Sequence, residues 1–366
     1  MKLIQIIDVR WYNACADFAI KQAQGLIMAG EDVLLLVNPG SPPAKKAREL
    51  GLETNEEIEF SRTGNFIWGT RRLREIAGKF GADVVMAHRG ESHLTAGLAS
   101  RSGRFKVARF RGDVRPPRRN ILSNWLNMRM TNGIAVSSER LKIEYERRYR
   151  LDGIPVQVIY PGLDLGNFEL KSSRDALRRH FGLNSEGKVI GIVGRFSPVK
   201  GHRYFIEAAK LVSLKHPASQ FVIAGGDAQL TNSELQTMAA ALKVPNMKIM
   251  GFVENVYELM ATFDIGVVAS LGSEMICRVL LEYFASGAAV VGTSVNQISE
   301  LMLVSNGGVL APAADSPALA EAIVKLIEND DLRRELSQRG RKWVEGRSLK
   351  TLGRETQSFL AEVINA

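Results

Sequence analysis

Short apolar runs alternate along the whole chain with longer stretches in which apolar residues recur at helical spacing. The short runs are rich in β-branched and aliphatic residues and predict buried strands, whereas the amphipathic stretches predict helices. Strands are expected in the first half at 2–8, 32–37, 83–88, 105–110 and 133–137. Strands are expected in the second half at 188–196, 220–226, 247–253, 264–270 and 288–293.

The expected helices fall between and after these strands. They are predicted at 15–30, 71–81, 200–215, 232–243, 255–262, 276–287, 316–328, 331–345 and 348–366. Strand–helix alternation of this kind indicates parallel sheets covered by helices. Because the alternation occurs twice in 366 residues, we expect an α/β protein with two Rossmann-like domains, whose parallel sheets face each other across a cleft.

The domain boundary is expected in IYPGLDLGNFELKSS (159–173), where proline and glycine interrupt the periodicity. This places an N-terminal domain at 1–165 and a C-terminal domain at 166–347. The last predicted helix, 348–366, is expected to pack back on the N-terminal domain.

The composition is that of a globular protein, with 45% hydrophobic and 24% charged residues. The two cysteines, Cys15 and Cys277, are too few for a disulfide framework or a zinc cluster, so a reducing compartment is expected. The opening MKLIQIIDVR does not have the pattern of a signal peptide, and no apolar run is long enough to span a membrane. A cytoplasmic location follows as an expectation.

Positive charge is concentrated in the first half of the chain. Residues 1–165 carry a net charge of +8 and residues 166–366 a net charge of +1, and the surplus is densest at 101–120. This segment is either an ordinary solvated surface or a contact with something anionic, such as a phosphorylated substrate, acidic lipid or nucleic acid. The following stretch, ILSNWLNMRM (121–130), places apolar residues beside arginines and is either core or a membrane-interface helix.

Ligands of doubly wound sheets bind beyond the carboxyl ends of the strands, which makes the loops there the first candidates. In GIVGRFSPVKGHRYFIEAAK (191–210), Gly194 and Arg195 end a strand, and Lys200 and Gly201 precede a helix. Two cations and a helix start suit a diphosphate, unless they are merely exposed loop residues. The chain lacks both the dinucleotide fingerprint GxGxxG and the P-loop pattern GxxxxGK[ST].

Two glutamates, Glu274 and Glu282, stand eight positions apart in a mostly apolar segment. The helix here is expected to start near Ile276 because Gly272 and Ser273 are loop-like. Buried carboxylates need partners, and the hydroxyls of a ribose or a hexose are suitable donors. The alternative is that Glu274 caps the helix and Glu282 pairs with a basic residue.

The segments GRFSPVKG (194–201) and SEMICRVLLEYFASG (273–287) resemble the donor-binding half of GT-B glycosyltransferases, in the retaining family called glycosyltransferase group 1 or family 4. The family motif E-x7-E corresponds to Glu274 and Glu282. The stretch VIYPGLDLGNF (158–168) resembles the family's interdomain strand. The patterns SExxCRVxLE and RGDxRP resemble those of a bacterial envelope or lipopolysaccharide subgroup.

The resemblance implies that Arg195 and Lys200 hold the donor diphosphate, that Glu274 holds sugar hydroxyls and that Glu282 holds the ribose. The nucleobase would lie near residues 251–254. The implied donor-binding set is Gly194, Arg195, Lys200, Gly251, Phe252, Val253, Glu274, Met275, Ile276 and Glu282. The implied catalytic set is Arg195, Lys200, Glu274, Asp113 and Arg111. At 275–278 the chain reads Met-Ile-Cys-Arg, where the family has a small residue followed by Phe-Gly, and this leaves the sugar open.

Candidates for the acceptor site come from the first half. Tyr12 and Asn13 stand in the first strand–helix loop, where the family has a glycine pair. Arg111 stands where many relatives have a histidine near the reacting sugar, Asp113 follows two residues later, and His88 ends an earlier strand. The alternatives are an ordinary Arg–Asp surface pair and a structural histidine.

We therefore expect a retaining glycosyltransferase that moves a sugar from a nucleotide sugar to an acceptor hydroxyl without a metal or cofactor. The surplus positive charge favours an anionic or lipid-linked envelope glycan, such as lipopolysaccharide core, and peripheral contact of 101–130 with the inner face of an anionic membrane. The alternatives are a Rossmann oxidoreductase, for which the glycine fingerprint is missing, and a nucleic-acid-binding protein. Nucleic-acid binding would not explain Glu274 and Glu282, so no nucleic acid partner is expected.

Overall fold

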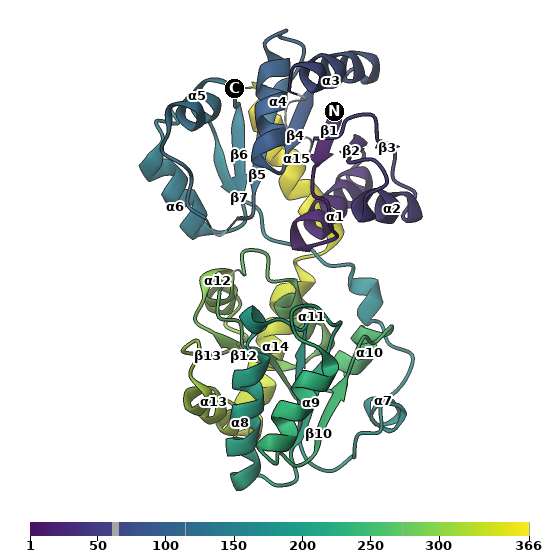
Figure 1. Ribbon diagram of the computed structural model, residues 1–366, viewed down its shortest axis with the longest axis vertical. Helices are drawn as coiled ribbons and strands as arrows, with labels where there is room; N and C mark the ends of the chain where they lie inside the picture. Colours follow the sequence, from purple (N-terminus) through teal and green to yellow (C-terminus); the bar gives the residue numbers. More distant parts are fainter. Residues whose placement is uncertain (61–65, 114, 273, 366) are drawn as a thin grey trace. The chain divides into compact units, whose positions relative to one another are not determined.

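The computed structural model describes residues 1–60, 66–113, 115–272 and 274–365 (Figure 1). Its contacts divide the chain into two compact units. Unit 1 comprises Met1–Leu163 and Arg347–Ala366, and unit 2 comprises Asp164–Gly346. The chain therefore leaves unit 1 once and returns to it for its final helix.

Unit 1 is built on a seven-stranded, fully parallel sheet in the order β3-β2-β1-β4-β5-β6-β7. Its strands are β1 (Lys2–Ile7), β2 (Asp32–Val37), β3 (Thr54–Asn55), β4 (Val84–Ala87), β5 (Lys106–Arg111), β6 (Gly133–Val136) and β7 (Val156–Val158). Its helices are α1 (Ala14–Met28), α2 (Pro42–Glu49), α3 (Phe66–Phe80), α4 (Gly90–Ser100), α5 (Ile121–Arg129), α6 (Glu139–Arg148) and α15 (Leu349–Asn365).

Unit 2 repeats the plan with a six-stranded parallel sheet in the order β10-β9-β8-β11-β12-β13. Its strands are β8 (Val189–Val193), β9 (Gln220–Ala224), β10 (Met247–Met250), β11 (Ile265–Val268), β12 (Ala289–Thr293) and β13 (Gly308–Ala311). Its α-helices are α7 (Arg174–His180), α8 (His202–Lys215), α9 (Asn232–Ala241), α10 (Val256–Met260), α11 (Arg278–Ser286), α12 (Asn296–Ser305), α13 (Ser316–Glu328) and α14 (Asp330–Glu345). Its short 3-10 helices are η1 (Leu165–Phe168) and η2 (Pro198–Lys200).

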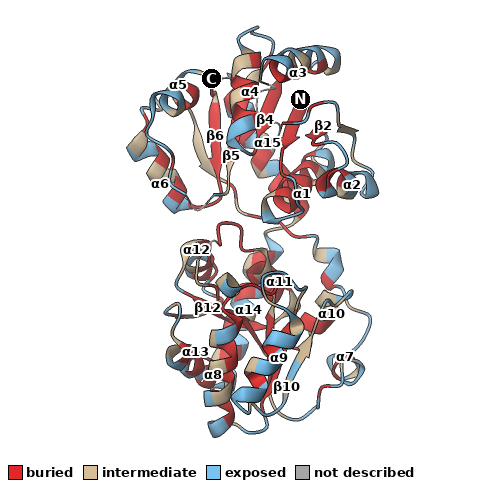
Figure 2. Cartoon of the chain, viewed as in Figure 1, coloured by how far each residue is buried: buried red, intermediate tan, exposed pale blue. Residues whose placement is uncertain are grey.

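Both sheets are covered by helices on two faces, and their central strands are buried over most of their length (Figure 2). This explains why the strands appear in the sequence as continuous apolar runs and not as alternating ones. In unit 2, residues of α8, α9 and α13 complete a core with β8, β9, β11 and β12. The expected α/β class with two Rossmann-like domains is confirmed.

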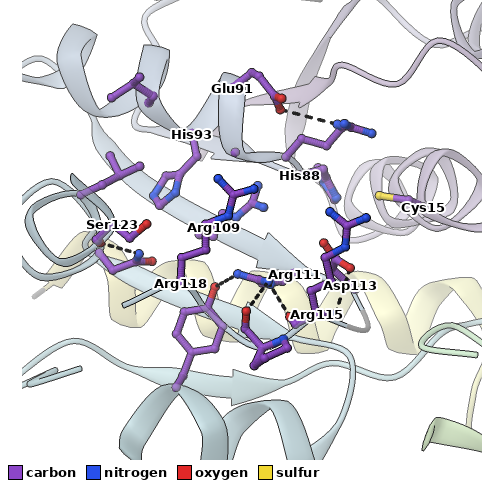
Figure 3. A pocket seen from close by; sticks show the side chains of 18 of the residues that line it. Cys15, His88, Glu91, His93, Arg109, Arg111, Asp113, Arg115, Arg118 and Ser123 are labelled. Atoms are coloured by element: carbon purple, nitrogen blue, oxygen red, sulfur yellow. Dashed lines mark hydrogen bonds and ion pairs between the residues drawn. The ribbon is translucent and has the colours of Figure 1, made fainter. Parts of the chain in front are cut away.

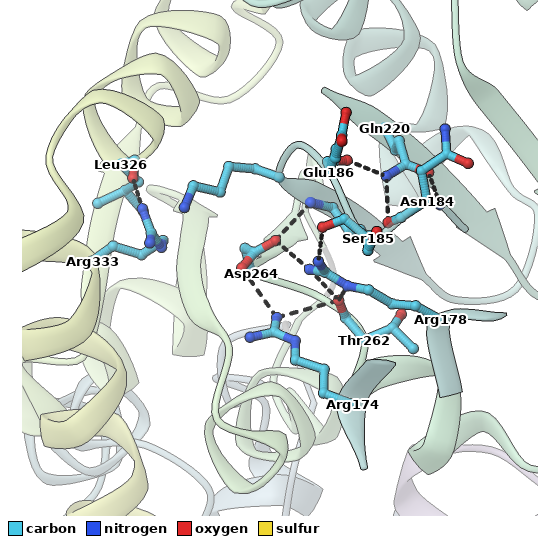
Figure 4. Close-up of polar contacts among 12 residues, drawn as sticks. Arg174, Arg178, Asn184, Ser185, Glu186, Gln220, Thr262, Asp264, Leu326 and Arg333 are labelled. Atoms are coloured by element: carbon cyan, nitrogen blue, oxygen red, sulfur yellow. Dashed lines mark hydrogen bonds and ion pairs between the residues drawn. The ribbon is translucent and has the colours of Figure 1, made fainter. Parts of the chain in front are cut away.

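The amino ends of the unit 2 strands are joined by a polar network (Figure 4). Asp264, just before β11, accepts hydrogen bonds from the amide of Val189 and from Arg178 of α7, each at 2.7 Å. Arg178 also donates to the carbonyl of Thr262. This network joins α7 to β8 and β11 at the amino ends of the strands, away from their carboxyl ends. Its charges therefore stabilise the fold.

The structure differs from the expected elements mainly at short or peripheral ones. Three edge strands, β3, β7 and β13, were not expected, because two to four residues carry too little periodicity to be recognised. Helices α2, α4, α6, α7 and α12 were not expected either, whereas α5 corresponds to the stretch 121–130 that was expected as core or as a membrane-interface helix. Helix α2 begins with two prolines and is strongly polar, so it lacks the apolar stripe on which the sequence analysis relied.

No helix in the described part of the chain combines the length and the apolar character needed to cross a membrane.

Helices α1 and α15 of unit 1 touch through two glycines, Gly25 and Gly353. A Cβ atom added at Gly25 would overlap the carbonyl oxygen of Leu349 and approach the amide nitrogen of Gly353 at 2.8 Å. The contact is reinforced by a hydrogen bond of 3.1 Å from the Gln22 side chain to the Thr356 hydroxyl. The absence of side chains at these two positions is what allows the helix backbones to touch.

We predict that Gly25→Ala lowers the stability of unit 1 by about 1–3 kcal/mol, because the backbones of α1 and α15 must move apart. Urea denaturation, followed by hydrogen exchange of peptides from α1 and α15, measures the loss. The matched control is Gly69→Ala in α3, where the added Cβ would have its nearest neighbours at 3.7 Å. If the two substitutions had equal effects, the close contact would not be important for stability.

Candidate functional site

The carboxyl edge of the unit 2 sheet contains the point where the strand order reverses. From β8 the chain proceeds outward through β9 and β10, and it then crosses to β11 on the other side of β8. Loops that leave adjacent strands in opposite directions open a crevice, which is where doubly wound folds bind their ligands. The loops after β8 and β11 contain Arg195, Lys200 and Glu274.

The loop after β8 is shaped by close backbone contacts. The amide of Gly194 donates to the carbonyl of Ala224 at 2.9 Å, and a Cβ at Gly225 would overlap the carbonyl of Gly194. Gly201 has a φ of +74° and touches the backbone of Ala269 after β11, so a larger residue would be both strained and obstructed. Gly194 and Gly225 thus allow the loop after β8 to touch the loop after β9, and Gly201 allows it to touch the loop after β11.

Lys200 and Glu274 form the centre of this edge. The Lys200 ammonium makes an ion pair with Glu274 Oε1, and the hydroxyl of Ser270 donates to the same oxygen at 2.8 Å. Glu274 is 5% exposed. A buried carboxylate needs such donors, because an unpaired one would be costly. The two residues are 74 positions apart in sequence and meet only because β8 and β11 are neighbours.

Arg195 lies exposed on the same loop and makes no ion pair within the described part of the chain. Its guanidinium is therefore available to an anion. The amides of Met275 and Ile276 donate no hydrogen bond to any described residue either. Their side chains are buried, so the loop backbone is fixed from beneath. A cation and unpaired amides on neighbouring loops are the donors that an oxyanion needs.

The helix that follows begins later than expected. Helix α11 starts at Arg278 with Cys277 as its N-cap, whereas the sequence analysis placed the start near Ile276. Glu274 therefore lies in the loop, where it neither caps the helix nor shares its periodicity. The loop is held by Gln297, whose side-chain oxygen accepts from the Cys277 amide at 2.6 Å. Ser273, on which part of the expectation rested, lies outside the described residues.

Glu282 is 3% exposed on α11 and pairs with Arg278, one turn earlier, with 2.7 Å between Oε1 and Nε. The alternative that Glu282 pairs with a basic residue thus describes its contact in this structure. The next residue, Tyr283, accepts a hydrogen bond from the Val193 amide at 2.7 Å and so fixes α11 to the end of β8. Glu282 is carried on a helix that is anchored to the candidate site.

Residues 251–253 follow β10, at the same edge of the sheet. The carbonyl of Gly251 accepts from the Gly225 amide at 2.9 Å, which links this segment to the loop after β9. Phe252 is 83% exposed. The predicted donor residues are thus distributed along the carboxyl edge from β10 to β11, with Lys200 and Glu274 in direct contact.

Unit 1 has its own crevice at the corresponding place, between the loops after β1 and β4. A cavity of 930 Å³ lies there, lined by these loops, by β5, by α4 and α5, and by the segment that joins β5 to α5 (Figure 3). Four of the expected acceptor residues line it, namely Asn13, His88, Arg111 and Asp113. Tyr12 does not, because its hydroxyl donates to Asp17 of α1 at 2.8 Å.

Arg111 is engaged by the protein itself. Its guanidinium donates to the carbonyls of Arg115 and Pro116, at 2.6 and 3.3 Å, and to the Tyr145 hydroxyl at 3.3 Å (Figure 3). Asp113 accepts from the Arg115 amide at 3.1 Å. Both expected residues therefore shape the loop that forms one wall of the cavity.

Arg109 was not singled out by the sequence analysis, although it lines the cavity. It lies on β5 two residues before Arg111, so the two side chains leave the same face of the sheet. Phe110 between them faces the other way and stacks on Phe18 of α1, with 4.1 Å between ring centres. The sequence does contain a signal for Arg109, namely two arginines at alternate positions of an otherwise mostly apolar strand.

The two histidines beside Arg109 are neutral at neutral pH. Burial lowers the pKa of His88 to about 3, and the nearby charge of Arg109 lowers it further. Burial, and then the charges of Arg109 and Arg111, lower the pKa of His93 well below its ordinary value. Burial raises the pKa of Asp8 to about 6, against the effect of Arg109 and Arg89, so Asp8 is mostly ionised above that pH.

Among the described residues, no group of three or more histidine, cysteine, aspartate or glutamate side chains is placed to hold a metal ion.

Comparisons with known proteins agree with this architecture. A family described as "Glycosyltransferase Family 4" matches residues 18–167, and one described as "Glycosyl transferases group 1" matches residues 187–329. The alpha-D-kanosaminyltransferase of Streptomyces kanamyceticus is 26% identical over 215 residues, which cover 58% of this chain and 55% of that protein. The chain spans about half the length of the curated relatives it matches.

Two solved structures share the fold over nearly the whole chain. The glycosyltransferase from Rickettsia africae ESF-5 has a TM-score of 0.87 at 19% identity, and covers 99% of this chain and 98% of its own. Anabaena HepE in complex with UDP has a TM-score of 0.86 at 19% identity. The match covers 99% of this chain and 100% of that chain. At such identities the likeness shows the fold alone.

The two sheets, the two family matches and these structures define a protein of the GT-B class. Two regions of the chain match the models of the group 1 and family 4 glycosyltransferases, and the chain has the fold of the two solved structures. These matches agree with the expected enzyme class.

Proposed function

We propose that the chain transfers a sugar from a nucleoside-diphosphate sugar to an acceptor hydroxyl, with unit 2 binding the donor. The observation that carries the proposal is the contact between Lys200 and Glu274 at the point where the strand order of unit 2 reverses. In this contact, a cation suited to a diphosphate lies against a carboxylate suited to the hydroxyls of a sugar.

The pair suggests how donor binding proceeds. When a diphosphate arrives, Lys200 turns to it and gives up part of its interaction with Glu274. Glu274 then accepts hydrogen bonds from hydroxyls of the sugar, which a carboxylate can do with both oxygens. Arg195 and the unpaired amides of Met275 and Ile276 add donors to the diphosphate. Each partner of the ion pair is replaced by a group of the substrate, so neither charge stays buried alone.

The nucleoside would occupy the remainder of the edge. Glu282 would accept from the ribose hydroxyls, with Arg278 holding the carboxylate in place. Gly251, Phe252 and Val253 would lie against the base. Uridine is the first base to test, because the Anabaena neighbour with this fold was solved with UDP.

We propose that transfer retains the anomeric configuration and uses no metal. Charge that develops on the leaving diphosphate would be stabilised by Arg195, Lys200 and the loop amides, which are fixed before reaction. No side chain of the donor edge is placed in the role of a covalent nucleophile in this proposal. Front-face attack assisted by the leaving phosphate is the route that fits it.

The acceptor is proposed to bind in the cavity of unit 1, and to be an anionic or lipid-linked envelope glycan such as lipopolysaccharide core. The net charge of +8 over residues 1–165 and the arginines around the cavity support an anionic acceptor.

Contact with an anionic membrane surface is proposed for the start of α5. Ile121 is 90% exposed and Leu122 is 54% exposed, and exposed Arg118 and Arg119 precede them. Leu126, one turn further along, is buried, so the exposed large apolar side chains of α5 lie in its first turn. An exposed apolar turn beside cations suits the headgroup region of anionic lipid.

We predict that a UDP-sugar raises the melting temperature of the wild-type protein, and that Lys200→Ala and Glu282→Ala remove this increase. At a ligand concentration a hundredfold above Kd, the stabilisation is about 2.7 kcal/mol, or roughly 5–10 °C for a domain of this size. A thermal-shift panel of UDP-, GDP- and ADP-sugars measures it. The ligand-induced increase is the quantity compared, because Lys200→Ala removes the cation that pairs with the buried Glu274 and lowers stability by itself.

Lys215→Ala is the control for this panel, since Lys215 is exposed at the far end of α8. It should respond as the wild type does. If all the variants responded to every donor as the wild type does, the assignment of the donor site would be wrong.

Retention predicts that an α-configured donor sugar is released first as the α anomer when the enzyme hydrolyses its donor in the absence of acceptor. Time-resolved proton NMR distinguishes the anomers before they equilibrate. First release of the β anomer would rule out retention, and Lys200→Ala serves as the control for non-enzymatic release.

Membrane contact predicts binding to vesicles that contain phosphatidylglycerol, weaker binding as salt is added, and little binding to phosphatidylcholine alone. Replacing Ile121 and Leu122 together by serine should weaken binding several-fold in a flotation assay. Ile67→Ser, at an apolar position of α3 that is 88% exposed, is the matched control. Equal loss in the two variants would contradict a specific contact.

A further inference from the structure

The cavity of unit 1 carries uncompensated positive charge. Its lining holds five arginines and two acids, a net charge of +3 with the histidines neutral. Glu91 already lies 3.7 Å from Arg89, and Asp113 accepts from a loop amide. Asp8, next to the lining, accepts from an amide of α4 at 3.3 Å and offsets one further charge. The cavity remains positive after all three acids are counted.

Arg109 is the buried member of this set, with 7% of its surface exposed. Its guanidinium donates to the carbonyl of Ala87 at 3.1 Å and makes no ion pair within the described part of the chain. Burying a charge without an opposite charge in contact is costly, and a guanidinium has five donors to satisfy. Most donors of Arg109 therefore have no protein partner, at a place where the cavity provides room for a ligand.

A buried ring lies beside it. Nε2 of His88 lies 2.8 Å from the Gln5 amide nitrogen. Nδ1 of the same ring is buried and has no partner among the described residues. Figure 3 shows Arg109 between His88 and His93, and the charge of Arg109 affects the pKa of both rings. His88, with one ring nitrogen unpartnered, and Arg109, with most of its donors unpartnered, thus both line the cavity.

The mouth of the cavity adds exposed cations. Arg115 and Arg118 line it, and neither side chain has a carboxylate partner among the described residues. Arg111 differs from them, because it is bound to the carbonyls of the loop and so keeps that loop in position. The arrangement is a buried guanidinium with two exposed ones nearby and few acids to compensate their charge.

We infer that this cavity binds a phosphate monoester, with Arg109 at its base and Arg115 and Arg118 at its mouth. A phosphate monoester is a dianion and matches the surplus positive charge better than a single carboxylate does. A guanidinium group also binds two oxygens of one phosphate through two parallel hydrogen bonds. A volume of 930 Å³ accommodates a phosphorylated sugar. That the bound molecule is the acceptor rests on the proposed function, whereas the phosphate site itself does not.

Calorimetric titration of the full chain, without donor, tests the site. Glucose 6-phosphate should bind saturably, and glucose and glucuronate should bind at least tenfold more weakly. Arg109→Gln should raise the Kd for glucose 6-phosphate at least tenfold, while Arg150→Gln, an exposed arginine outside the lining, should change it less than twofold. Equal binding of glucuronate, equal losses in the two variants, or no saturable binding to the wild type would each overturn the inference.

A measurement on the unmodified protein covers the case in which Arg109→Gln does not fold. Phenylglyoxal modifies accessible arginines, and inorganic phosphate should protect the peptides that contain the exposed Arg115 and Arg118 but not the peptide that contains Arg150. Mass spectrometry reads the two groups of peptides in one sample. Protection of all of them alike, or of none, would contradict the site.

Two further probes distinguish where the phosphate comes from. Dihexanoyl phosphatidic acid carries a phosphate monoester on a short lipid, and glucose 6-phosphate carries one on a sugar. Arg109-dependent binding of either supports the site, and the tighter of the two identifies the source. Because the donor panel tests unit 2 alone, a failure of phosphate binding leaves that result intact, and a failure of the donor panel leaves the phosphate site intact.

Discussion

Both units depend on one constraint, which is that all of their strands run parallel and the strand order reverses once. Parallel strands deliver every loop that carries chemistry to the same edge, and the reversal separates two of these loops. In unit 2 the result is contact between Lys200 and Glu274, and in unit 1 it is a cavity beside β1 and β4. In the rest of each unit, apolar strands and the helices packed against them form the hydrophobic core.

Buried charges are paired differently at the carboxyl ends of the two sheets. In unit 2, each buried carboxylate has a cation from the protein, since Glu274 meets Lys200 and Glu282 meets Arg278. In unit 1, the buried Arg109 has a carbonyl and no carboxylate in contact. Paired charges can exchange partners at little net cost, whereas an unpaired cation gains from any anion that reaches it. The first arrangement suits a substrate with both hydroxyls and phosphates, and the second suits an anion.

Much of the fold could be predicted from the sequence because buried parallel strands are plain apolar runs. The edge strands β3 and β13 are too short to show a pattern, and α2 has no apolar stripe. Lys200 and Glu274 were found through motif spacing, since no local periodicity relates residues 74 positions apart. Arg109 was missed although 105–110 was expected to be a buried strand, because the sequence does not show that this side chain lines a cavity.

The return of the chain to unit 1 has a consequence for its synthesis. Helix α15 fills a groove that α1 and β6 leave open, with Phe359 and Val363 packed where Gly133 has no side chain. A ribosome therefore releases the first seven strands well before the element that completes their core exists. During that interval unit 1 would expose the apolar surface that α15 later covers, whereas unit 2, continuous in sequence, can close as it emerges.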